Sequence, residues 1–172
     1  MPRVLIAGPL RKRLFLEALP KLADRAIGFS TSPVLDRFET VGYKLVTLDR
    51  REAVVAHAAA QSGIAWNGMR INVSKIDEIV NAAFYRPTGP RTIYAIDEIG
   101  EMLLYSQAFQ RALQEIFKAG ATVAATVADK PKAYVDSLRK LKDVVWIDVN
   151  DENIGPARKR LFRELNLGVP SP

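Results

Sequence analysis

Short apolar runs alternate with amphipathic stretches along most of the chain. Largely apolar runs, which are typical of buried strands, occupy residues 4–7, 92–96, 121–127 and 144–149. Stretches with apolar residues at helical spacing predict a helix soon after residue 8 and further helices over residues 105–118, 130–140 and 155–165. Strands that alternate with helices of this length predict a mostly parallel central sheet with helices on both faces.

The segment between the first two of these strands departs from the alternation. Residues 28–48 are rich in β-branched and aromatic residues and predict an antiparallel hairpin added to the sheet. The alanine-rich residues 53–60 fit a helix as well as a strand. Residues 69–73 predict a short strand, and Ser74 with Asp77 three positions later is typical of a helix N-cap.

Composition limits the size of the protein and its chemistry. The chain has 172 residues, of which 48% are hydrophobic, and no repeat or linker divides it, so residues 1–172 are expected to form a single domain. The absence of cysteine excludes disulfides and thiolate zinc sites, and the single histidine, His57, argues against a histidine-based triad. Any chemistry must therefore come from carboxylates, Lys, Arg, hydroxyls and the backbone.

The charge balance is basic. A net charge of +6 and a sequence pI near 9.7 favour anionic partners such as phosphates and nucleotides, with a merely basic soluble protein as the alternative. The basic runs at residues 139–142 and 158–160 have no interleaved aromatics and predict solvated helix faces, so nucleic acid is not an expected partner. The sequence does not identify a protein partner. Arginine outnumbers lysine and glutamine is scarce, which is typical of a thermophilic source.

No targeting or membrane-spanning segment is evident in the sequence. No apolar run approaches the ~20 residues that cross a bilayer. The first residues lack the order of charge and the cleavage site of a secretory signal. We therefore expect a cytoplasmic protein with no membrane partner.

The clearest chemical signal is a pair of carboxylates after the most apolar strand. Asp97 and Glu98 directly follow residues 93–96, and ligands of open α/β sheets bind at the carboxyl ends of strands. There Asp97 would hold Mg²⁺ on a phosphate, and Glu98 would orient or deprotonate an attacking water. The alternative is an acidic strand-to-helix junction in which Glu98 favours a helix N-terminus.

A basic loop after the first strand is the second signal. A strand, a glycine, a basic loop and a helix form the layout of a phosphate-binding loop, in which backbone N–H groups hold an anion. The candidate phosphate contacts are Gly8, Pro9, Arg11, Lys12 and Arg13, with a solvated turn as the alternative. The full pattern Gly-x-x-x-x-Gly-Lys-Ser/Thr is incomplete, because the second glycine and the hydroxyl are both missing.

Several segments, in order along the chain, resemble the thermophile nucleoside-triphosphatase family, whose members are small P-loop proteins with a cancer-related human homologue. The matching segments are Gly-Phe-Ser-Thr at 28–31, Val-Gly-Tyr-Lys-Leu-Val-Thr-Leu-Asp at 41–49, Ile-Asn-Val at 71–73, Asp-Glu-Ile-Gly-Glu-Met at 97–102, the strand at 122–127 and Asp-Glu-Asn at 151–153. The resemblance runs from residue 4 to about residue 153 and implies a three-layer P-loop NTPase-like α/β fold. It also implies Mg²⁺-dependent hydrolysis of nucleoside triphosphates, with Thr126 near the γ-phosphate.

The departures from the family lie mainly in the loop. The family loop reads Gly-x-Pro-Gly-x-Gly-Lys-Thr-Thr-Leu, and aligning its leucine with Phe15 makes the present loop two residues shorter. Lys12 then takes the lysine position, and Arg13 and Leu14 replace the hydroxyls. A smaller departure is Glu101, which stands where the family has lysine.

These observations predict a nucleoside-triphosphatase-like protein with a degenerate phosphate-binding loop, one that binds nucleotide or phosphate with weak or no hydrolysis. One alternative is an active Mg²⁺-dependent enzyme that hydrolyses ATP or GTP and uses Lys12, Asp97 and Glu98. Another is a catalytically dead scaffold that binds a protein or RNA. For the first two, Gly8 and Asp97 must emerge at the same edge of one parallel sheet.

Overall fold

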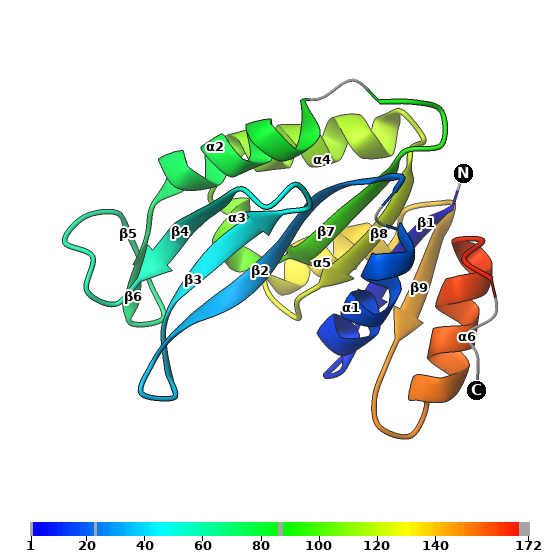
Figure 1. The fold of residues 1–172 in the computed structure, drawn as a ribbon, viewed down its shortest axis with the longest axis horizontal. Helices are drawn as coiled ribbons and strands as arrows, with labels where there is room; N and C mark the ends of the chain where they lie inside the picture. The colour runs from blue at the N-terminus through cyan, green and yellow to red at the C-terminus, as the bar shows by residue number, and fades with distance from the viewer. Residues whose placement is uncertain (1, 23, 86–87, 169–172) are drawn as a thin grey trace.

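The fold is built on one mixed sheet flanked by helices (Figure 1). The computed structural model describes residues 2–22, 24–85 and 88–168, and within them the sheet has nine strands in the order β5-β6-β4-β3-β2-β7-β8-β1-β9. The strands are β1 (Arg3–Ala7), β2 (Ala26–Asp36), β3 (Glu39–Thr47), β4 (Glu52–His57), β5 (Ile64–Trp66), β6 (Met69–Ile71), β7 (Ile93–Ile99), β8 (Thr122–Val127) and β9 (Val144–Asp148). The helices are α1 (Arg11–Leu22), α2 (Val73–Phe84), α3 (Glu101–Leu104), α4 (Gln107–Lys118), α5 (Lys132–Arg139) and α6 (Ile154–Glu164).

The parallel half of the sheet contains the strands that carry the predicted site. Strands β2, β7, β8, β1 and β9 all pair in parallel. Ala124 of β8 lies opposite both Val4 of β1 and Ala95 of β7, so the three strands share one register. Gly8 and Asp97 therefore emerge at the same edge of the sheet, which confirms the central prediction about the fold.

The antiparallel half extends further than the predicted hairpin. Strands β2 and β3 form that hairpin, and β4, β6 and β5 continue it by antiparallel pairing. The ambiguous alanine-rich segment becomes β4, because β3 and β6 both offer it backbone partners. The Asn67-Gly68 turn between β5 and β6 has φ of 47° and 74°, the left-handed values that a two-residue hairpin requires.

Helices cover both faces of the sheet, as the three-layer prediction requires. One face packs against α2 and α4, with α3 and α5 beside them, and its core includes Phe29, Phe84 and Phe109. The other face packs against α1 and α6 through residues such as Leu14 and Phe162. Within the described ranges, no helix combines the length and apolarity needed to cross a bilayer.

The N-cap predicted at Ser74 is wrong. Asn72 caps α2 instead, and its side-chain oxygen accepts a hydrogen bond from the backbone N–H of Lys75. Asp77 accepts the Ser106 hydroxyl at 2.5 Å, and Ser106 also caps α4 by accepting from the backbone N–H of Phe109. Asp77 thus joins α2 to α4 and does not act in a capping box with Ser74, since Ser106 is fully buried and needs both of its partners.

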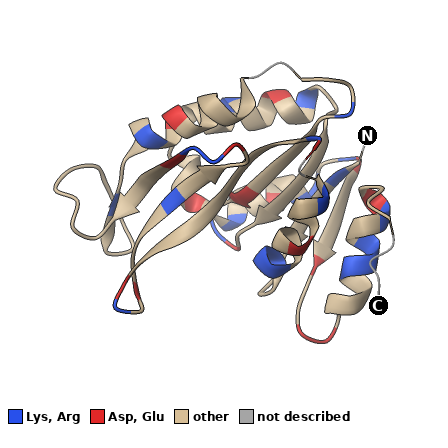
Figure 2. Cartoon of the chain, in the orientation of Figure 1, with Lys and Arg blue, Asp and Glu red and all other residues tan. Residues whose placement is uncertain are grey.

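Arg158 is not part of a solvated face, in contrast to the prediction for residues 158–160. Its guanidinium donates to both carboxylate oxygens of Glu17, at 2.6 and 3.2 Å, and so links α6 to α1. The hydrogen bond from Arg158 lowers the pKa of Glu17 below its ordinary value of 4.5, and Glu17 in turn raises the pKa of Arg158. In Figure 2 the basic segments are distributed over several elements, α6 among them, so the positive charge is not confined to the loop after β1.

Candidate functional site

The loop after β1 turns sharply at Gly8. Gly8 has φ of +93°, and a Cβ at this position would lie 2.4 Å from the carbonyl oxygen of Val149. The backbone N–H of Leu10 donates to that carbonyl oxygen at 3.4 Å, and the N–H of Arg11 donates to Gly8 O at 3.2 Å. The chain can therefore enter α1 directly above the sheet edge only because this residue is a glycine.

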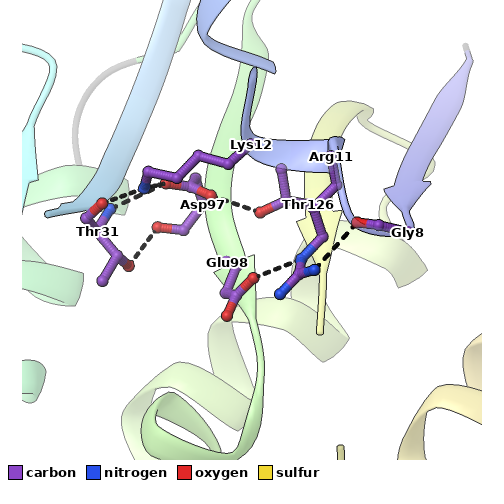
Figure 3. A network of polar contacts seen from close by, with 7 residues as sticks. All are labelled: Gly8, Arg11, Lys12, Thr31, Asp97, Glu98 and Thr126. Carbon is purple, nitrogen blue, oxygen red and sulfur yellow. Dashed lines mark hydrogen bonds and ion pairs between the residues drawn. The ribbon is translucent and has the colours of Figure 1, made fainter. Parts of the chain in front are cut away.

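Asp97 lies at the centre of a polar network at this edge (Figure 3). Its side chain is only 1% exposed. The Thr126 hydroxyl donates to Oδ1 at 2.7 Å, and Oδ2 accepts from Lys12 Nζ at 2.5 Å and from the backbone N–H of Thr31 at 3.2 Å. Both carboxylate oxygens are thus occupied by groups of the protein itself.

Thr31 anchors the network from β2. Its hydroxyl donates to the backbone carbonyl of Asp97 at 2.5 Å, and its own carbonyl accepts from Lys12 Nζ. Phe29 lies opposite Ile96 in the parallel β2–β7 pairing, so the residues that follow on the two strands meet at the same edge. Lys12 is consequently held between two strands, with its ammonium on the buried carboxylate.

Glu98 is held by the first cation of α1. Arg11 Nε donates to Glu98 Oε2 at 2.8 Å, and Arg11 NH1 donates to the carbonyl oxygen of Gly8 at 3.0 Å. The two side chains are 22% and 32% exposed, so solvent or a ligand can reach this pair more readily than it can reach Asp97. The guanidinium bridges the loop and the end of β7 (Figure 3).

The third cation of the loop turns away from the site. Arg13 Nε lies 3.3 Å from Glu17 Oε1, one helical turn along α1, and Pro9 is exposed. Each of the three loop cations therefore already faces a carboxylate. The backbone N–H groups of Lys12 and Arg13 have no hydrogen-bond partner within the described residues, which is normal for the first turn of a helix.

The structure brings most of the predicted site residues together. Gly8, Arg11, Lys12, Asp97, Glu98 and Thr126 belong to one network, whereas Pro9 and Arg13 lie outside it. Thr31 was missed as a site residue, although it belongs to a segment that resembles the family. Its pairing could be found only from the β2–β7 register, which a single sequence does not display.

The fit of this site to Mg²⁺ is poor as the side chains stand. The Lys12 ammonium lies on Asp97 Oδ2, and the Thr126 hydroxyl lies on Oδ1. The first-turn residues of α1, Arg11 to Leu14, carry no hydroxyl group. No cluster of three or more His, Cys, Asp or Glu suited to a metal ion occurs among the described residues.

The fold and the site together define a class of protein. A parallel α/β sheet that brings a glycine-led loop, a helix N-terminus and two strand-end carboxylates to one edge is the P-loop NTPase-like arrangement. A family model described as NTPase matches residues 13–165, so the chain belongs to this family of small nucleoside triphosphatases. The match begins at Arg13, after β1 and most of the loop.

Relatives with established names support this assignment over nearly the whole chain. The chain is 28% identical over 165 residues to the nucleoside-triphosphatase THEP1 of Thermotoga sp. strain RQ2, covering 95% of this chain and 92% of that protein. It is 27% identical over 139 residues to the mouse cancer-related nucleoside-triphosphatase homolog, covering 73% of each.

Solved structures share the fold. The crystal structure of THEP1 from Aquifex aeolicus superposes with a TM-score of 0.81 at 24% identity, covering 96% of this chain and 99% of that one. The solution structure of a human cancer-related nucleoside triphosphatase gives a TM-score of 0.76 at 22% identity, covering 95% and 96%. At these identities the likeness establishes the fold alone.

Proposed function

We propose that this chain is a nucleoside-triphosphatase-like protein that binds nucleotide or phosphate and hydrolyses nucleoside triphosphates slowly or not at all. The observation that carries this proposal is the pairing of Lys12 with Asp97 and of Arg11 with Glu98. Family membership favours nucleoside triphosphates as the ligand class, since the named relatives are nucleoside triphosphatases. The two ion pairs argue against efficient turnover.

Binding is supported by the start of α1. The free N–H groups of Lys12 and Arg13 lie at the positive end of the helix dipole, where phosphate oxygens are favoured. Arg11 is the accessible cation, because its pair with Glu98 is partly solvent-exposed. A phosphate that approaches the loop would replace the Glu98 carboxylate as the acceptor of the Arg11 guanidinium. Hydrogen bonds from a guanidinium to a carboxylate or to a phosphate are both charge-assisted and strong.

Slow hydrolysis follows from what the catalytic groups are bonded to. Glu98 Oε2 accepts a hydrogen bond from Arg11 Nε, so this oxygen is not free to orient an attacking water. The loop is two residues shorter than the family pattern, and Arg13 and Leu14 offer no hydroxyl. The loss of one preorganised donor costs on the order of 10²–10³ in rate, and several are changed here.

Mg²⁺ enters this proposal as a weak partner of the bound nucleotide. Asp97, the residue expected to hold it, offers an oxygen only after the Lys12 ammonium moves away. We therefore expect Mg²⁺ to add little to nucleotide affinity. In the alternative of an active enzyme, the Lys12 ammonium must leave Asp97 in every turnover.

Titration calorimetry with ATP, with and without Mg²⁺, tests the proposal. The loop variant replaces Arg11, Lys12 and Arg13 with Ala, and the matched control replaces Lys159, Arg160 and Arg163 of α6, which changes the net charge equally. We expect wild type and the α6 variant to bind, with Mg²⁺ changing affinity less than about threefold, and the loop variant to lose binding. Unchanged affinity in the loop variant would place the anion site elsewhere, and no binding by wild type would leave the scaffold alternative.

A further inference from the structure

A cavity adjoins Glu98 and is separate from the loop after β1. Its volume is about 380 Å³, which falls within the ~300–1,000 Å³ of small-molecule sites. The cavity is bounded by residues of β2, β3, β5, α3 and the segment that follows β8. None of residues 8–13, all of which are described, lines it.

One wall of the cavity is aromatic. The rings of Tyr43 and Trp66 are 5.9 Å apart at 63°, an edge-to-face contact. Trp66 Nε1 donates to Glu101 Oε2 at 3.0 Å, so the indole is fixed in orientation. Met102 adds a thioether, which packs well against rings. Such a wall presents a preformed surface to a planar ligand.

The polar lining is acidic. Glu98, Glu101 and Asp129 line the cavity together with one cation, Lys130. Arg11 balances Glu98, whereas Glu101 and Asp129 form no ion pair within the described ranges. Carboxylate oxygens accept hydrogen bonds from hydroxyl and amino groups, and they repel phosphate. The cavity is thus suited to ligands with hydroxyl or amino groups, whereas the loop is suited to phosphate.

We propose that this cavity binds a neutral or cationic aromatic molecule of nucleoside size. Its ring lies against Tyr43 and Trp66, and its hydroxyl or amino groups donate to Glu98 and Glu101. The cavity shares Glu98 with the proposed function, and Thr31 of the Asp97 network also lines it, but the proposal does not need the loop to bind phosphate. Glu98 then forms the wall between an anion site on one side and an aromatic site on the other.

The test uses adenosine as the neutral probe and adenosine 5′-carboxylate as its anionic counterpart. Binding is followed in the ¹⁵N-labelled full chain through the indole N–H resonances, because the chain has only two tryptophans. Trp146 is the internal control: it lies in β9, with the Arg139 guanidinium 4.0 Å above its ring. The two resonances are assigned with Trp146→Phe.

We expect adenosine to shift the Trp66 resonance saturably and to leave Trp146 unmoved. The 5′-carboxylate should bind at least about tenfold more weakly, since its charge faces the carboxylates. Tyr43→Ala should weaken adenosine binding about tenfold or more by removing a stacking surface. Glu101→Gln keeps an oxygen that can accept from the indole N–H but removes a negative charge. This variant should reduce the ratio of the affinity for adenosine to the affinity for adenosine 5′-carboxylate.

Four results would overturn the proposal: no shift of Trp66, equal shifts of both indoles, equal affinity for the two probes, or displacement of adenosine by tripolyphosphate. Tripolyphosphate added alone reports on the loop in the same samples. If it fails to bind while adenosine shifts Trp66, the proposed function is wrong and the cavity proposal stands. The reverse pattern rejects the cavity and leaves the phosphate site intact.

Discussion

The loop after β1 and the end of β7 lie at one edge of the sheet, yet they differ in what they retain. The end of β7 has the residue types that phosphate chemistry uses, with Asp97 buried beside Thr126 and Glu98 next to it. The loop lacks the inner glycine and the hydroxyls. Two of its cations, Arg11 and Lys12, instead bind the two carboxylates. Under the proposed function, these two ion pairs keep Asp97 and Glu98 from acting on a bound nucleotide.

Restoring the loop should produce the largest effect. Inserting two residues and the run Gly-Lys-Thr-Thr would lengthen the turn after Gly8 and remove Arg11 from Glu98. We expect steady-state phosphate release to rise at least about a hundredfold over wild type, because one recovered donor alone is worth that much. The control is the same restored loop with Glu98→Gln, which should lose the gain. A restored loop with wild-type turnover would show that β7 is itself incompetent.

Breaking the deeper ion pair should have the next largest effect, on stability. Lys12→Met leaves the Asp97 carboxylate without its cation, and hydrogen bonds to charged groups contribute about 1.5–3 kcal/mol. We expect the free energy of unfolding in urea to fall by about 1–3 kcal/mol, the lower bound reflecting the 42% exposure of Lys12.

Two further variants make this result specific to the ion pair. Lys142→Met removes an exposed lysine of the same size and should change stability by less than about 0.5 kcal/mol. Combining Lys12→Met with Asp97→Asn should cost less than the sum of the single changes, since contacting residues couple. Additivity would mean that Lys12 and Asp97 do not interact.

The smallest effect concerns an ion pair outside both regions. The pKa of Glu17 is lowered by Arg158, so the pair stabilises the fold fully above pH 4.5, the ordinary value, and loses that contribution as the pH falls through the lowered pKa. Because the pair is about one-third exposed, its contribution should stay below about 1 kcal/mol. Comparing unfolding free energies of wild type and Glu17→Gln at pH 7 and pH 3 checks this: the difference should shrink at pH 3. A constant difference would contradict it.

The strands of the parallel half were predictable because strands that are buried on both faces have continuous apolar runs in the sequence. Residues 93–96 are such a run, and the carboxylates that follow them were placed at the correct edge. The alanine-rich β4 was ambiguous because alanine suits helix and strand alike, and only its neighbours β3 and β6 decided it. The predicted N-cap at Ser74 was wrong because Asn72, two residues earlier, caps α2, while Asp77 accepts from Ser106, 29 residues away.

The contacts of the site could not be predicted for the same reason. Lys12 and Asp97 are 85 residues apart, and Arg11 and Glu98 are 87 apart. The sequence showed three cations and two carboxylates at one edge, which suggested that the cations face an anion. Their proximity also allows direct pairing, and the structure shows it for two of the cations, Arg11 and Lys12. One sequence feature relates to the aromatic cavity: Glu101 stands where the family has lysine. Its carboxylate accepts a hydrogen bond from Trp66 and so fixes the orientation of the indole.

Steady-state phosphate release by the wild-type chain tests the central claim most directly. It should be measured with ATP and GTP beside a THEP1 relative from Thermotoga and the Glu98→Gln variant of this chain. If the loop cations hold Asp97 and Glu98, wild-type turnover will lie at least about a hundredfold below that of the relative, and Glu98→Gln will change it little. Turnover comparable to that of the relative, abolished by Glu98→Gln, would contradict the account and identify an active enzyme.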